Sequence, residues 1–386
     1  MTASRIRRLG LLCLFALSLP LLSGCGAFGT DYARLEQLRV AQTLGVDDAD
    51  SGLRLSLATA AGDRSGSDAV CLSADGPTFS AALERAQTRS TEETLFCGHI
   101  RQLVVGEHVA LAPLLRTVGR SADLRLDTPL WLLRDSSAEM LLSGAGSGTR
   151  GITEILSAAQ TQLDRSGGRG AFTAGRVLQD LQQHGSALAC VLTYTEASER
   201  AESAADARGS GSPARTAALA GFAVIQDDAV RTYLKAEELL GISLLRNRMG
   251  VQSLTLRDRN GLNAALEIRQ GSTRIRPVWS ETGALQGLDI SATVKAVLLE
   301  GGGEDIKDAY IDDLTARLES AVAEQLRGLL RRCKLYRADF LGLGDRVEAA
   351  SPLAFRHLEQ PFAELLPELE ISLSVQGAIQ HEYDME

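Results

Sequence analysis

The feature that most constrains the fold is a long amphipathic pattern in the last third of the chain. Between Glu304 and Leu335, apolar residues recur every three or four positions, which places them on one face of an α-helix. These residues are Ile311, Leu314, Leu318, Val322, Leu326, Leu329 and Cys333. Acidic residues gather at the start of the segment and basic residues at its end, which complements the helix dipole. The pattern predicts one long helix over residues 304–335.

The segment before this helix has a different period. From Gln252 the apolar residues alternate with polar ones, and the alternation resumes at Leu262 after the pair Asn260-Gly261. Asn-Gly between two alternating runs is a strong hairpin signal, because both turn positions need a positive φ. Further strands are predicted at 274–279, 288–298 and 369–379. Strands beside a long helix predict an α+β class with several small sheets flanked by helices.

The first half of the chain mixes both kinds of element. Helices are predicted at 78–88, 109–118, 136–142, 152–163 and 173–184, and strands at 39–45, 53–57, 94–105, 129–133 and 187–194. Thr78 is a plausible N-cap of its helix. After residue 215 the patterns predict a strand at 217–225 and a helix near 229–240.

Residues 196–215 differ in kind, because they contain only small, polar and charged side chains. Such a composition cannot bury apolar surface and marks a linker. We therefore expect an N-terminal mixed α/β domain over 25–195, a linker over 196–215 and a C-terminal α+β region over 216–386. The last would comprise a small subdomain at about 216–250 and a sheet with the long helix at 251–386.

The N-terminus reads as an export signal. Arg5, Arg7 and Arg8 precede an apolar run over 9–22, which is too short to span a bilayer and is typical of a signal peptide. Leu22-Ser23-Gly24-Cys25 follows the lipobox pattern, so residues 1–24 would be removed and Cys25 would carry the lipid. The alternative is an ordinary secretory signal with a chance cysteine. The net charge of −9 argues against nucleic-acid binding and against membrane binding through a polybasic surface. A protein anchored by acyl chains needs no such surface.

No pattern predicts a cofactor, a metal or a catalytic site. The sequence Gly146-Ser147-Gly148-Thr149-Arg150-Gly151 spells a dinucleotide motif, but a predicted helix precedes it where a strand is required. Cys97 and His99 would share one face of a strand, without a third ligand at a recognisable spacing. Cys71, Cys97, Cys190 and Cys333 allow three pairings, and their disulfide state stays open.

The order of several motifs resembles one known family. The segments that carry the resemblance follow the lipobox in order: 38–47, 96–107, 123–133 with Ala138-Glu139-Met140-Leu141, Gly221-Phe222-Ala223-Val224, and Asp339-Phe340-Leu341-Gly342-Leu343-Gly344 with Pro352. Together they resemble the Ger(x)C family, the lipoprotein C subunits of spore germinant receptors. The resemblance covers nearly the whole chain after residue 25.

The resemblance implies a non-catalytic protein of three mixed α/β domains. Such a subunit is anchored through its lipid to the outer face of the spore inner membrane and acts with the membrane A and B subunits of the receptor. Whether it binds a nutrient directly is left open. A second hypothesis is a solute-binding lipoprotein that delivers a nutrient to a transporter, which would favour two similar lobes around a cleft.

Overall fold

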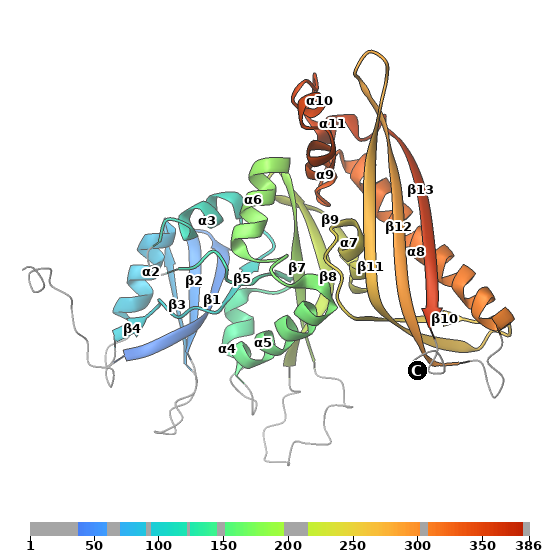
Figure 1. Cartoon of the computed structure of the whole chain (residues 1–386). Helices are drawn as coiled ribbons and strands as arrows, with labels where there is room; N and C mark the ends of the chain where they lie inside the picture. Colours follow the sequence, from blue (N-terminus) through green and yellow to red (C-terminus); the bar gives the residue numbers. More distant parts are fainter. Residues whose placement is uncertain are drawn as a thin grey trace, which may run out of the picture.

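Two β-sheets and their helices form the molecule. The computed structural model describes residues 38–59, 70–89, 94–121, 124–144, 151–196, 215–301 and 308–380. In this part of the chain, nine strands form one sheet and four form another (Figure 1). The predicted mixed α/β class is therefore confirmed, with one sheet larger than expected.

The larger sheet combines parallel and antiparallel strands. Its spatial order is β3 (Cys71–Gly76), β2 (Gly52–Thr59), β1 (Leu38–Ala49), β5 (Gln102–Gly106), β6 (Leu130–Arg134), β7 (Ser186–Glu196), β8 (Arg215–Gln226) and β9 (Ala229–Lys235). Strands β1, β5, β6 and β7 are parallel, and antiparallel hairpins extend the sheet on both sides. The short β4 (Thr94–Phe96) pairs in parallel with the start of β1.

Helices cover both faces of this sheet. One face packs against α2 (Phe79–Thr88), α3 (Leu111–Val118) and α6 (Ala174–His184), and the other against α4 (Ala138–Gly144) and α5 (Ile152–Leu163), which ends in a π-turn at Asp164–Gly168. Side chains of successive residues in the central strands lie on opposite faces of the sheet. Leu130 and Leu132 face the first set of helices, whereas Trp131 and Leu133 face the second. Strands buried on both faces must be apolar throughout, which explains the run of large apolar residues in β6.

The predicted linker joins two neighbouring strands of this sheet. Strands β7 and β8 pair antiparallel out to the partners Glu196 and Arg215. Residues 197–214, most of the predicted linker, lie outside the described residues. The expected division at 196–215 therefore does not interrupt the sheet, and β8 and β9 belong to it. Low-complexity composition cannot distinguish a connection between paired strands from one between domains.

The prediction of a helix near 229–240 is wrong for the first half of that segment. Residues Ala229–Lys235 form β9, followed by a 3₁₀ turn at Ala236–Glu238 and then by α7 (Leu239–Leu245). The cause is the turn before β9. Gln226 pairs with Ala229, and Asp227 and Asp228 between them both have positive φ values, 53° and 59°. Two such residues form the two-residue turn that matches strand twist, so the chain folds back as a hairpin.

The smaller sheet carries the long helix. Its strands are β10 (Gln252–Arg257), β11 (Asn263–Trp279), β12 (Leu285–Glu300) and β13 (Glu370–Gln380), in that order. The predicted hairpin at Asn260-Gly261 is confirmed, but its loop covers residues 258–262 and, of the pair, only Gly261 has a positive φ, +78°. Helix α8 (Asp308–Tyr336) covers one face of the sheet (Figure 1). Helices α9 (Leu343–Ala350), α10 (Pro352–Arg356) and α11 (Phe362–Leu365) complete a crossover to β13, which pairs in parallel with β12.

Helix α7 joins the two sheets into one core. All seven of its residues, Leu239 to Leu245, are buried. Its Gly241 lies so close to α8 that an added Cβ atom would be 2.7 Å from the Leu329 side chain, and its Leu244 contacts β11 at Gly271. The same apolar cluster includes Trp131 of the larger sheet and Leu266 of the smaller one. The two sheets are thus parts of one packed body.

Candidate functional site

The predicted anchor residue Cys25 lies outside the described residues. Within the described part of the chain, no helix combines the length and apolar character needed to cross a membrane.

Two weaker sequence motifs lie wholly or partly within the described residues. Gly151 precedes α5, and the element before the glycine-rich segment is α4, as predicted, while residues 145–150 lie outside the described ranges. Cys97 and His99 were expected in a strand, but they lie in the turn between β4 and β5, with Cys97 buried and His99 exposed. Gly98 and the following turn break the strand there. Nowhere among the described residues do three His, Cys, Asp or Glu side chains lie close enough to share a metal.

The four described cysteines are free thiols. Cys97, Cys190 and Cys333 are buried, and Cys71 is half-buried. Burial raises the pKa of the Cys71, Cys190 and Cys333 thiols. Because the thiolate is the reactive form, a raised pKa makes these side chains poor nucleophiles and poor metal ligands.

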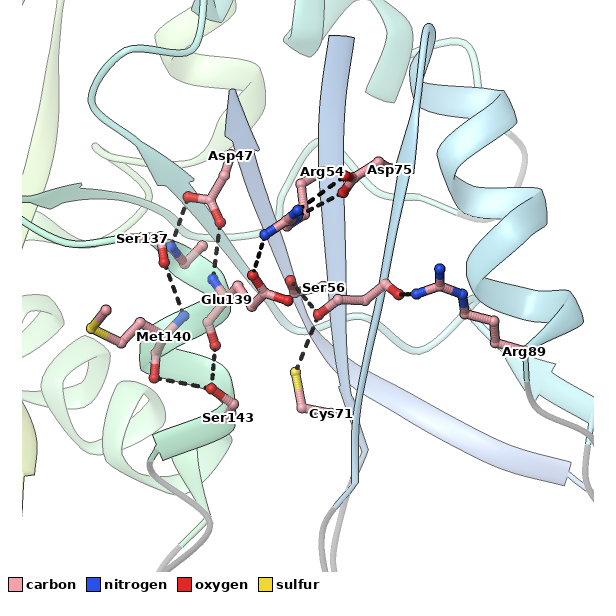
Figure 2. Close-up of polar contacts among 12 residues, drawn as sticks. Asp47, Arg54, Ser56, Cys71, Asp75, Arg89, Ser137, Glu139, Met140 and Ser143 are labelled. Carbon is pink, nitrogen blue, oxygen red and sulfur yellow. Dashed lines mark hydrogen bonds and ion pairs between the residues drawn. The ribbon is translucent and has the colours of Figure 1, made fainter. Parts of the chain in front are cut away.

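Ligands of parallel sheets usually bind at the carboxyl ends of the strands. At that edge Asp47, near the end of β1, lies against the start of α4 (Figure 2). Its two carboxylate oxygens accept hydrogen bonds from the backbone N–H groups of Ala138, at 2.7 Å, and Glu139, at 2.9 Å. Burial raises the pKa of Asp47, and the two hydrogen bonds partly offset that rise. The carboxylate therefore caps α4 and is occupied by the protein itself.

Arg54 of β2 binds two further carboxylates beside this cap. Its guanidinium donates to both oxygens of Asp75, at 2.6 and 2.9 Å, and to Glu139 of α4 at 2.6 Å (Figure 2). The hydrogen bond from Arg54 lowers the pKa of Asp75 below its usual range. A bidentate pair fixes the side-chain geometry. The cluster therefore holds α4 on β2 and β3, and each of its charged groups already has a partner within the protein.

A further acidic residue at this edge, Glu107, also has an internal partner. Glu107, directly after β5, accepts a hydrogen bond from the Tyr233 hydroxyl at 2.6 Å. Arg134 lies over the Tyr233 ring, 4.4 Å from its centroid. Burial and the neighbouring Glu107 raise the pKa of Tyr233. These contacts attach β9 to the parallel strands.

A groove of about 560 Å³ lies where α6 and the β8–β9 turn meet α9 and α11. His184 of α6 approaches the Asp345 carboxylate at 3.3 Å, and Arg337 pairs with Glu364 at 3.0 Å. The contact of His184 with Asp345 joins α6 to α9 across this groove, so the groove lies at the junction of the two sheets.

A buried ion pair lies beneath this groove. Arg246, after α7, donates to Asp180 of α6 at 3.1 Å and to the Phe340 carbonyl oxygen at 2.6 Å. Asp180 also pairs with Arg176 at 2.8 Å. The side chains of Asp180 and Arg246 are 3% and 8% exposed, and burial lowers the pKa of Arg246. The pair ties α6 to the segment after α8.

Sequence reasoning identified neither this pair nor the cluster around Arg54. One signal was available: Asp180 interrupts the apolar stripe of α6, between Val177 and Leu181. The partner of such a residue depends on tertiary packing, and Arg246 is 66 positions away.

Comparisons with known proteins agree with the fold. A crystal structure of the GerBC protein is similar over 87% of this chain and 96% of its own length, with a TM-score of 0.55 and 15% identity. At that identity the likeness shows the shared fold. No curated protein sequence matches the chain.

Two family models match the sequence in tandem. Residues 31–194 match the spore germination protein N-terminal domain, and residues 220–382 match the C-terminal domain described as spore germination B3/GerAC like. Together they cover most of the chain in the order that the motif resemblance predicted, so the chain belongs to the GerAC-like family of spore germination proteins.

Proposed function

We propose that this protein is the C-type subunit of a spore germinant receptor and works with membrane A and B subunits to start germination. The single observation that carries the proposal is the tandem match of both family domains over residues 31–194 and 220–382. The role is non-catalytic. In support, the carboxylates at the carboxyl edge of the parallel strands, where an α/β enzyme would place its chemistry, are occupied by internal contacts.

The proposal includes a lipid anchor at Cys25. The signal-like residues 1–24 and the lipobox Leu22-Ser23-Gly24-Cys25 support it. Two or more acyl chains give stable attachment where one is marginal. The acidic body would then lie on the outer face of the spore inner membrane, held there by acyl chains and by its partner subunits.

The anchor is tested by Cys25→Ala. We expect the variant to move from the membrane fraction to the soluble fraction, because no acyl chain can be attached. Cys71→Ala is the matched control, because Cys71 lies within the described fold and should leave membrane attachment unchanged. A Cys25→Ala protein that resists a carbonate wash would contradict the lipid anchor.

The receptor assignment is tested by co-purification. Full-length protein carrying an affinity tag is purified from detergent-solubilised spore membranes, and co-eluting proteins are identified by mass spectrometry. We expect an A-type and a B-type receptor subunit to co-elute. Their absence, with the bait recovered intact, would remove the main support for the assignment.

The solute-binding alternative has less support. A solute-binding protein of that kind would have two similar lobes. Here the larger sheet has a parallel centre, whereas the smaller sheet is mainly antiparallel.

A further inference from the structure

The smaller sheet leaves one face open to solvent. Helix α8 packs on the other face, where Ile290, Ala292 and Val294 of β12 are buried. The alternate residues of the same strand, among them Ser291 and Thr293, are exposed. A trough of about 560 Å³ crosses this open face, a volume typical of small-molecule sites.

Strand register builds the floor of the trough from two rows of side chains. In the first row, Arg274 of β11 lies opposite Ser291 of β12, which lies opposite Ser374 of β13. In the second row, Ser272, Thr293 and Gln376 are aligned in the same way. Side chains at paired positions are close neighbours on one face of a sheet. The floor is therefore a compact set of hydroxyl and amide groups beside a guanidinium.

One wall of the trough is held rigidly. The Asn247 side chain accepts from the Thr273 N–H at 2.6 Å and donates to the Thr273 carbonyl oxygen at 3.0 Å. Arg346 of α9 donates through one nitrogen to the same carbonyl oxygen at 2.8 Å. This contact fixes the Arg346 guanidinium beside the floor. Its remaining N–H groups have no hydrogen-bond partner among the described residues.

The charged side chains that line the trough are all positive. The lining contains Arg274 and Arg346, and none of the described residues in it is acidic. Arg274 has no hydrogen bond or ion pair with any described residue. A smaller adjoining hollow of about 190 Å³ adds Lys295. In a chain with a net charge of −9, this is a local concentration of unneutralised positive charge.

The next row on the same face differs, because an acidic residue lies opposite the arginine there. Arg276 lies opposite Asp289, which accepts a hydrogen bond from Ser372. Arg274, two positions earlier, faces a serine instead. The row of Arg274 thus lacks the carboxylate that the row of Arg276 contains.

We propose that the trough binds a small oxyanion, a carboxylate or phosphate group, held by the guanidinium groups of Arg274 and Arg346 and by hydroxyl donors of Ser291, Thr293 and Ser374. Planar guanidinium groups match both kinds of oxyanion, and hydrogen bonds to charged groups are the stronger ones. This site goes beyond the receptor assignment and does not depend on it.

The test is isothermal titration of the full-length protein in non-ionic detergent at low salt. Inorganic phosphate and succinate are the two probes, and glycerol is the neutral control. We expect saturable binding of at least one anion with a dissociation constant below about 10 mM. Comparison of the two anions distinguishes a phosphate site from a carboxylate site.

The variant Arg274→Gln should weaken this binding about tenfold or more, because it removes a charged donor. Arg276→Gln, on the same face but outside the trough, should leave the affinity within about twofold. Absence of saturable binding of either anion by the wild-type protein would overturn the proposal. An equal loss in both variants would also overturn it, since it would indicate general attraction to the surface charge. Neither result would affect the co-purification expected for a receptor subunit.

Discussion

At the scale of single residues, the contact between Asp180 and Arg246 matters because each charge is buried and needs the other. Asp180→Ala would leave Arg246 as an uncompensated buried cation and also remove the partner of Arg176. Breaking a buried pair from one side typically costs about 3–5 kcal/mol. We expect a loss of unfolding free energy in that range, measured by urea denaturation of the full-length protein.

The matched control is Asp313→Ala on α8. Asp313 pairs with Arg317 four residues on, and that pair is largely exposed, with side chains 32% and 41% accessible. Exposed pairs of this spacing contribute about 0.3–0.5 kcal/mol. The double variant Asp180→Leu with Arg246→Met should recover much of the stability lost in Asp180→Ala, because both charges are removed together. Equal effects of Asp180→Ala and Asp313→Ala would refute the importance of burial here.

At the scale of elements, the packing of α7 on α8 depends on a glycine. In Gly241→Ala the new Cβ atom would lie 2.7 Å from the Leu329 side chain, inside a fully buried interface. Overpacking of a core typically costs about 1–3 kcal/mol. We expect Gly241→Ala to lower the thermal unfolding midpoint, measured by circular dichroism.

Gly328, one residue before Leu329, is the control. It lies within α8, and an added Cβ atom would meet nothing within 4 Å. Alanine is favoured over glycine in a helix by about 0.8–1.0 kcal/mol, so Gly328→Ala should raise the midpoint. Both variants replace glycine by alanine, and the two sites differ in the space available to the added Cβ atom. A shift in the same direction for both would contradict the packing described for α7.

Most elements could be predicted from local patterns because local physics determines them. Thr78 accepts a hydrogen bond from the Ala81 N–H and caps α2 as expected, and Gly261 supplies the positive φ of the β10–β11 turn. The prediction was wrong where the turn chemistry was less familiar. Asp227-Asp228 forms a two-residue turn with two positive φ values and no glycine, and the strand that follows was predicted to be a helix.

At the scale of the whole molecule, the sequence carries less information. The trough depends on the register of Arg274, Ser291 and Ser374, which come from three strands spread over a hundred positions. No local pattern encodes such an alignment. The proposed anchor at Cys25 differs, because the sequence pattern that predicts it is entirely local and the residue lies outside the described part of the chain. The family resemblance could be predicted because it needs only the order of short motifs.

The ladder between β7 and β8 has a consequence for exchanging parts between members of this family. The two family models meet between residues 194 and 220, so a hybrid protein built at that point would take β7 from one parent and β8 from the other. Eleven aligned residue pairs, from Ser186 with Gln226 to Glu196 with Arg215, would then have mixed parentage. A crossover placed after Lys235 would keep the whole larger sheet from one parent. The natural unit of exchange is therefore the sheet, and its end lies beyond the family boundary.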